Sequence, residues 1–236
     1  MTLKAVLFDF NGVIINDEPL HQKLIEQILL EENLRPRVGE FRQLCLGRSD
    51  RVCIRDLLAA RGRVVTEEYI TNLVVRKSQA YQQQLSEIEK LPTYPGLADL
   101  IFQIRSAQLP MAIVSGAVGA EIELVLARVE LAPYFSVIVA GDDILTSKPD
   151  PMGYLLAVDR LNQKFPDLNL RPQECLAIED TPAGIQSAQR AGMQVVGVAN
   201  SYPYHMMHRQ SNWAVDYLSE LEFDRVREVY AQRVAA

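Results

Sequence analysis

The sequence is poor in cysteine, with only Cys45, Cys53 and Cys175 among its 236 residues. These cysteines form no C-x-x-C pair and their number is odd, so their spacing indicates neither a disulfide framework nor a zinc knuckle. We therefore expect small, buried apolar thiols, which are typical of proteins in the reducing cytosol.

Long hydrophobic runs are also absent. The apolar start from Ala5 to Phe8 is ended by Asp9, far short of a signal-peptide core, and no later run approaches the length of a membrane span. With 48% apolar and 23% charged residues, the chain can bury a full globular core. We therefore expect a soluble, cytoplasmic protein without membrane contact.

An excess of positive charge is missing as well. The 24 Lys and Arg residues against 30 Asp and Glu residues give a net charge of −6, and the pI is near 5.2. Proteins that bind nucleic acid usually carry a basic face, so this composition argues against a nucleic-acid partner. We expect a small-molecule ligand and no obligate protein partner.

Short, β-rich apolar runs alternate with helical patterns along most of the chain. The expected strands are 5–10, 111–114, 137–139, 175–178 and 195–198. The expected helices between them are 97–107, 120–129, 154–161 and 183–191. This alternation is typical of a parallel sheet covered on both faces, so the sequence predicts a doubly wound α/β core.

One stretch interrupts the alternation. From 18 to 90 only helical patterns occur, such as Leu20, Leu24 and Ile28, so an inserted helical domain is predicted there. The core would then comprise 1–17 and 91–236. A last stretch, 215–221, is expected to be an amphipathic piece that packs on the core.

Polar residues follow several of the expected strands or lie in the loops near them. Asp9 lies near the end of the first expected strand, Ser115 follows the second, Glu179-Asp180 follows a later one, and Lys148 lies in a loop. In an open parallel sheet, ligands bind beyond the carboxyl ends of the strands. These side chains are therefore expected to converge on one site.

These residue types suit phosphoryl transfer. A carboxylate can attack phosphorus, which splits one difficult displacement into two easier steps. Because a phosphate dianion repels a carboxylate, such a site needs a hard cation, held by carboxylates and a backbone carbonyl. A lysine, a hydroxyl and adjacent backbone N–H groups can bind the remaining phosphoryl oxygens.

The sequence resembles the haloacid dehalogenase superfamily, and within it the branch of phosphoglycolate-type phosphatases and β-phosphoglucomutase. The resemblance covers nearly the whole chain and is carried by four motifs in the right order. These motifs are 8–21, 113–117, 147–151 and 178–193. Singly, an aspartate after a strand is better explained as a helix cap, but four motifs together outweigh that reading.

The resemblance implies roles for the motif residues and a Mg²⁺ cofactor. Asp9 would be the nucleophile and a metal ligand, Asp180 a second metal ligand, and Glu179 a ligand or a partner of the ligands. Ser115 would donate to the transferred phosphoryl group, and Lys148 would neutralise it and orient the nucleophile.

Asn11 departs from the family pattern. The family has an aspartate here, whose backbone carbonyl binds the metal and whose carboxyl group is the general acid and base. An amide cannot donate and recover a proton at neutral pH, so metal binding should survive while acid-base catalysis should not. Asn16 is a second departure, since close relatives usually carry an acidic residue there.

The resemblance also implies residues that contact the substrate. They are Gly116 in the second motif and His21, Gly47, Arg48 and Lys77 in the insert. A structural role is an equal alternative for His21, and a solvated charge is nearly as good a reading of Arg48 and Lys77.

Three functions remain open on the sequence. The leading one is a phosphatase that acts on a small phosphorylated metabolite through an aspartyl phosphate on Asp9. A phosphosugar mutase would pass the same phosphoryl group to another hydroxyl. A metal- and phosphate-binding protein that has lost turnover would account for Asn11.

Overall fold

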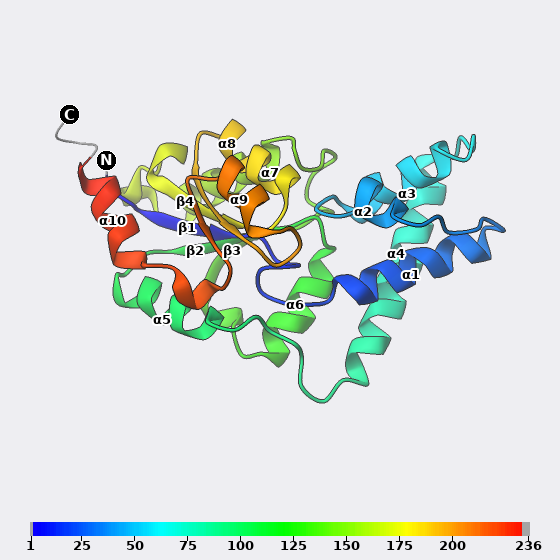
Figure 1. The fold of residues 1–236 in the computed structure, drawn as a ribbon, viewed down its shortest axis with the longest axis horizontal. Coiled ribbons are helices and arrows are strands. Elements are labelled where there is room, and N and C mark those ends of the chain that lie inside the picture. Colours follow the sequence, from blue (N-terminus) through cyan, green and yellow to red (C-terminus); the bar gives the residue numbers. More distant parts are fainter. Residues whose placement is uncertain (1, 233–236) are drawn as a thin grey trace.

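The computed structural model describes residues 2–232 and has a six-stranded, fully parallel sheet at its centre (Figure 1). The strand order is β3-β2-β1-β4-β5-β6. The strands are β1 (Ala5–Phe8), β2 (Met111–Val114), β3 (Phe135–Val139), β4 (Cys175–Glu179), β5 (Gln194–Val198) and β6 (Trp213–Val215). The predicted α/β class with a doubly wound parallel sheet is confirmed.

Helices cover both faces of this sheet because alternate strand residues point to opposite sides. Val6 and Phe8 of β1 lie in one apolar cluster with α5 (Leu97–Ser106), α6 (Gly119–Arg128) and α10 (Phe223–Gln232). Ala5 and Leu7 lie in a second cluster with α7 (Met152–Lys164), α8 (Pro182–Arg190) and α9 (Tyr204–Gln210). Short 3₁₀ helices occur at Ala132–Tyr134, Pro166–Leu168, Pro172–Glu174 and Leu218–Glu220.

Each expected strand and helix has a counterpart in the structure, although several bounds differ by two or three residues. The first strand ends at Phe8 rather than Phe10, and the three-residue β6 was not predicted. The stretch 215–221 does pack on the core, since Val215, Leu218 and Leu221 are buried there. It comprises the end of β6 and a 3₁₀ turn, and helix α10 follows it.

The segment expected to be all-helical has four helices and no named strand between residues 18 and 90. They are α1 (Glu18–Glu31), α2 (Glu40–Leu44), α3 (Asp50–Ala59) and α4 (Glu67–Ser86). They share a separate apolar cluster that includes Ile28, Leu57 and Leu73, and Figure 1 shows them to one side of the sheet. The domain boundaries after residues 17 and 90 stay predictions. Among the described residues, no helix has the length and apolar character that a membrane span requires.

The expectation of three free thiols was wrong. Cys45, just after α2, and Cys53, in α3, form a disulfide, while Cys175 is free and buried in β4. Sequence spacing did not reveal the pair because the fold of the insert, rather than a C-x-x-C motif, brings the two cysteines together. The cysteines therefore no longer support a reducing compartment.

We predict that the disulfide stabilises the loop that it encloses. Its sequence separation is 8, and closing so short a loop corresponds to about 2.5 kcal/mol of unfolding free energy in the chain-entropy account. A reductant should lower the unfolding free energy of the wild type in urea, but not that of the Cys45→Ser/Cys53→Ser variant. Three titratable thiols in the denatured, unreduced wild type would contradict the bridge.

Candidate active site

Strand pairing brings three acidic residues to one edge of the sheet. Asp9 directly follows β1, and Glu179 and Asp180 lie at the end of the neighbouring strand β4, where Phe8 pairs with Ile178. The Asp9 N–H donates to the Ile178 carbonyl at 2.9 Å. The three carboxylates are buried, and each offers an oxygen within 4.8 Å of the others.

Lys148 provides a positive charge among these carboxylates. Its Nζ lies 2.7 Å from Asp9 Oδ1 and 2.7 Å from Glu179 Oε1, and its side chain is buried. Glu179 Oε1 also accepts a hydrogen bond from the Tyr154 hydroxyl at 2.6 Å. The lysine is thereby positioned beside the reactive oxygen expected on Asp9.

The pKa values of this cluster reflect its excess of negative charge. Burial and the Asp9 carboxylate raise the pKa of Glu179 to about 7, although Lys148 opposes the rise. Burial and Asp9 also raise the pKa of Asp180 well above its usual range. Burial alone would lower the pKa of Lys148, but Asp9 and Glu179 outweigh it and raise that pKa. A further cation would relieve this strain on the carboxylates.

Asp180 has the free ligand atom that a cation site needs. Its Oδ2 accepts a hydrogen bond from the Ser201 hydroxyl, while its buried Oδ1 has no hydrogen-bond partner among the described residues. A buried carboxylate oxygen without a partner is costly, and carboxylate oxygens are the ligands that Mg²⁺ prefers. The donor set of Asp9 and Asp180 therefore fits a hard divalent cation.

Gly12 leaves the space in which Asp180 lies. Its φ of +78° is in the left-handed region, and a Cβ there would lie 1.9 Å from Asp180 Oδ2. The Gly12 carbonyl also accepts a hydrogen bond from Asn200 Nδ2 at 2.6 Å. The loop after β1 therefore requires glycine for both conformation and space.

The second motif lies beside the first. Ser115 follows β2 and its N–H donates to the Val139 carbonyl at 2.9 Å, while its Oγ accepts from the Ala117 N–H at 3.0 Å. Gly116 has no room for a side chain because a Cβ would lie 2.7 Å from the Arg48 carbonyl of the insert. The loop after β2 is therefore in close contact with the loop of the insert that contains Arg48.

A cavity of about 50 Å³ lies between the sheet edge and the insert. Its lining includes the expected site residues Asp9, Asn11, His21, Gly47, Arg48, Gly116 and Lys148. Gly47, with φ of +77°, approaches the core so closely that a Cβ would lie 2.6 Å from Thr181 Oγ1. The Ser49 N–H donates to Ser147 Oγ at 2.8 Å, which fixes the same loop to the core.

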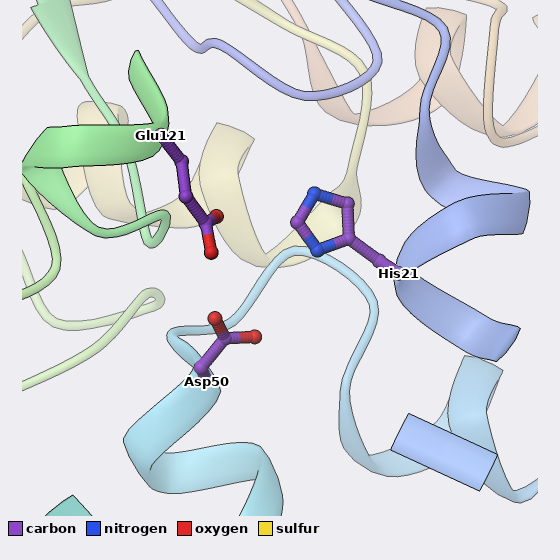
Figure 2. Close-up of side chains that lie close together, drawn as sticks. All are labelled: His21, Asp50 and Glu121. Carbon is purple, nitrogen blue, oxygen red and sulfur yellow. The ribbon is translucent and has the colours of Figure 1, made fainter. Parts of the chain in front are cut away.

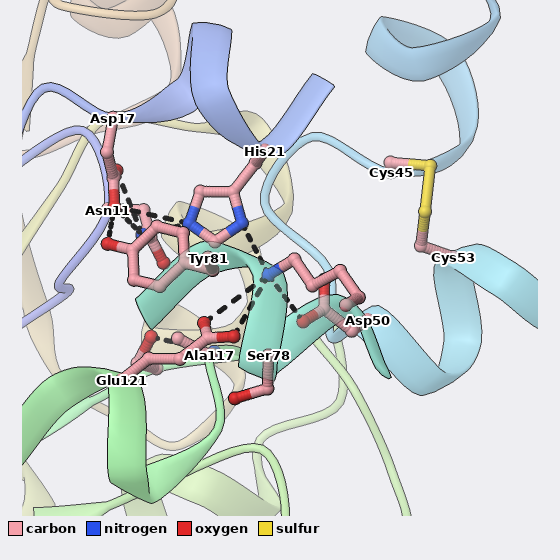
Figure 3. Close-up of polar contacts among 12 residues, drawn as sticks. Asn11, Asp17, His21, Cys45, Asp50, Cys53, Ser78, Tyr81, Ala117 and Glu121 are labelled. Carbon is pink, nitrogen blue, oxygen red and sulfur yellow. Dashed lines mark hydrogen bonds and ion pairs between the residues drawn. A yellow bond between two sulfur atoms is a disulfide. The ribbon is translucent and has the colours of Figure 1, made fainter. Parts of the chain in front are cut away.

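Asn11 takes part in a buried polar network at the start of α1 (Figure 3). Its Nδ2 lies 3.0 Å from both carboxylate oxygens of Asp17, to which it donates, and 3.0 Å from His21 Nε2. The Tyr81 hydroxyl of α4 also donates to Asp17. A carboxylate at position 11 would face the Asp17 carboxylate, whereas the amide complements it.

Lys77 does not reach the cavity wall, although a substrate contact was expected there. Its Nζ lies 2.6 Å from His21 Nδ1, 2.8 Å from Asp50 Oδ2 and 3.3 Å from both Glu121 carboxylate oxygens. Figure 2 shows His21, Asp50 and Glu121 facing one another. The three could be taken for metal ligands, but the lysine ammonium already satisfies them.

Sequence reasoning missed Asp17, Asp50 and Glu121. Asp17 carried a signal, because it precedes His21 by four residues at the start of a helix, where the two side chains share a face. Glu121 lies on α6 of the core and Asp50 on α3 of the insert, so only the folded arrangement brings them together.

Comparison with known proteins agrees with this geometry. Residues 6–198 match the family described as haloacid dehalogenase-like hydrolase. The chain belongs to this family. It is 27% identical over 200 residues to a phosphorylated carbohydrates phosphatase of Thermotoga maritima, covering 84% of this chain and 87% of that protein.

Two further likenesses concern one relative in sequence and one solved structure with the same fold. A phosphoglycolate phosphatase of Pectobacterium atrosepticum is 28% identical over 203 residues, covering 86% of this chain and 82% of that protein. The crystal structure of a β-phosphoglucomutase from Clostridium difficile superposes with a TM-score of 0.85 at 22% identity, covering 99% of this chain and 100% of that one. The predictions of the superfamily and of an enzyme among its phosphatases are confirmed.

We predict that Gly12→Ala destabilises the protein more than Gly62→Ala does. Both glycines have positive φ, but a Cβ at Gly62 would meet nothing within 4 Å, whereas one at Gly12 would displace Asp180. Backbone strain should cost about 1–2 kcal/mol in each variant, and overpacking about 1–3 kcal/mol more at Gly12 alone. Urea unfolding measures the loss of unfolding free energy in both variants. Equal losses would contradict the prediction, because they would show that the loop at Gly12 accommodates a methyl group without cost.

Proposed function

We propose that this enzyme is a Mg²⁺-dependent phosphatase of small organic phosphates that acts through an aspartyl phosphate on Asp9. The observation that carries the proposal is the buried group of Asp9, Glu179, Asp180 and Lys148 at the ends of β1 and β4. The names of the related phosphatases support the same chemistry.

Asp9 is the nucleophile in this proposal. One of its carboxylate oxygens forms a bond to phosphorus while the bond from phosphorus to the leaving oxygen breaks. Lys148, 2.7 Å from Asp9 Oδ1, holds that carboxylate in place and offsets the negative charge of the phosphoryl group. Water then attacks the phosphorus while the bond from phosphorus to the Asp9 oxygen breaks, which releases inorganic phosphate and restores Asp9. The proton that this water loses balances the one that the departed oxygen takes up from solvent.

Asp9, Asp180 and the backbone carbonyl of Asn11 would hold Mg²⁺, and Glu179 would act mainly through Lys148, to which it is paired. Bound there, the ion supplies positive charge that lets a phosphate dianion approach a carboxylate. The unpartnered Oδ1 of Asp180 supports this assignment. The insert, proposed as residues 18–90, would cover the site and exclude water.

The position of Asn11 determines which substrates react easily. Its amide donates to Asp17, so it neither protonates a leaving oxygen nor activates water. General acid-base catalysis is typically worth about 10² to 10⁴ in rate. Alkoxide leaving groups, which need a proton as they depart, should suffer most, while acyl phosphates should suffer least.

We expect one Mg²⁺ to bind the wild type in calorimetry and Asp180→Ala to abolish that binding, because Asp180 has the free ligand atom. Asp159→Ala is the matched control, since this carboxylate is exposed on α7. Undiminished binding in Asp180→Ala would refute the metal assignment.

We expect the exchange variant Asn11→Asp/Asp17→Asn to gain activity toward sugar phosphates. It installs a carboxyl group at position 11 while keeping both the charge and an amide-carboxylate pair across the 3.0 Å contact. The kcat for sugar phosphates should rise by about 10² or more, and that for acetyl phosphate by much less. Steady-state kinetics at matched metal occupancy measures both.

Two single variants serve as controls for this exchange. Asn11→Asp alone places two carboxylates face to face, so it should gain less, and Asp17→Asn alone installs no acid, so it should gain nothing. The interpretation of Asn11 fails if the wild type already hydrolyses alkyl phosphates at ordinary enzyme rates of roughly 1 to 10³ s⁻¹.

A further inference from the structure

The loop that follows β5 lies next to the proposed metal ligand Asp180. Its Asn200 Nδ2 donates to the Gly12 carbonyl at 2.6 Å, which fixes it to the loop after β1. The hydroxyl of the next residue, Ser201, is hydrogen-bonded to Asp180 Oδ2. This loop therefore positions one oxygen of Asp180 while Oδ1 is left for a cation.

Two residues of the insert reach the same loop. Glu18, the first residue of α1, accepts a hydrogen bond from the Ser201 hydroxyl. Arg42 of α2 donates from Nη2 to the Ser201 carbonyl at 2.9 Å, and its guanidinium lies 4.4 Å from the centre of the Tyr202 ring. A cleft of about 590 Å³ lies between the insert and the core here, and it is lined by Glu18, Arg42 and Ser201. The two insert residues thus bridge this cleft.

Ser201 has more acceptors than it can serve. Its Oγ lies within hydrogen-bond distance of both Glu18 Oε1 and Asp180 Oδ2, but a hydroxyl group has a single proton to donate. Two ionised carboxylates therefore compete for that proton, and the one whose charge is less compensated is the stronger acceptor. Without a cation, Asp180 is a strong competitor, because its buried Oδ1 has no hydrogen-bond partner in the described part of the chain.

We propose that Ser201 is a positioning residue whose single proton couples Mg²⁺ binding at Asp180 to the docking of the insert. With the charge of Asp180 offset by an ion at Oδ1, Ser201 donates preferentially to Glu18, and this charge-assisted hydrogen bond holds α1 against the core. Linkage is reciprocal, so the docked insert favours the ion in turn. The inference rests on the Mg²⁺ site of the proposed function, and it means that the insert closes over a loaded site rather than an empty one.

The amide of Ser49 reports whether the insert is docked. Its N–H donates to Ser147 Oγ of the core at 2.8 Å, so undocking exposes it to hydrogen exchange. The neighbouring Arg48 N–H donates to the Cys45 carbonyl within the insert at 2.9 Å. Its exchange therefore measures local opening of the insert and serves as the internal reference. Neither rate requires substrate turnover.

We expect saturating Mg²⁺ to slow exchange of the Ser49 amide in the wild type by about fivefold or more relative to the Arg48 amide, which is the usual size of such couplings. Hydrogen exchange followed by NMR measures the rates, and calorimetry establishes saturation. An unchanged relative rate in a protein that binds the ion would overturn the coupling and leave the proposed phosphatase standing. A wild type that binds no Mg²⁺ would overturn the metal assignment as well.

Two variants end the competition for the proton. Ser201→Ala has no hydroxyl, and Glu18→Gln has an amide that can donate to Ser201 Oγ, which leaves the serine proton to Asp180. In each, saturating Mg²⁺ should change the relative Ser49 rate by less than about twofold. Ser201→Thr keeps the hydroxyl and should retain the wild-type effect. The full effect in either Ser201→Ala or Glu18→Gln would overturn the proposal, and Glu18→Gln decides alone if Ser201→Ala fails to fold.

A third variant separates the strength of docking from its dependence on the ion. Arg42→Met removes a contact that does not use the Ser201 proton, so the Ser49 amide should exchange faster with and without Mg²⁺, and the effect of the ion should persist. Ser86→Ala is the control, because it removes an exposed hydroxyl that donates to the Gln83 carbonyl in α4; it should change neither rate. Loss of the Mg²⁺ effect in Arg42→Met would overturn the role of the proton.

Discussion

The structure depends above all on the burial of three carboxylates with one lysine at the ends of β1 and β4. Buried charges are costly unless they are paired, and Lys148 can pair only with Asp9 and Glu179. Asp180 is left with an oxygen, Oδ1, that has no hydrogen-bond partner within residues 2–232. The space that this group needs also constrains its neighbours. At Gly12, for example, a Cβ would lie 1.9 Å from Asp180 Oδ2. The Mg²⁺ proposed for this site would offset the excess negative charge of the group.

A second constraint is the polar contact between Asn11 and Asp17. The Asp17 carboxylate receives hydrogen bonds from Asn11, His21 and Tyr81. These partners come from the loop after β1, from α1 and from α4. The Asp17 carboxylate therefore joins the insert to the core rather than lining the cavity.

The sequence predicted the sheet and the residues at the strand ends because both follow from local patterns. Alternating β-rich runs indicate buried parallel strands, and motif residues such as Asp9 and Asp180 follow those strands directly. The disulfide and the Lys77 contacts were missed because they join separate helices of the insert or join insert to core. Short β6 at the sheet edge gave too few residues for a periodic signal.

The polar network around Lys77 explains why this residue, which was expected to contact the substrate, instead pairs with acidic side chains. Lys77 would be costly to bury alone, and Asp50, Glu121 and His21 together compensate its charge. That compensation removes a cation from the cavity and leaves Asp50 in its wall. The ion pairs of Lys77 therefore join the insert to the core immediately behind the cavity wall. A change at Asp50 should consequently affect both the contact between insert and core and the charge of that wall.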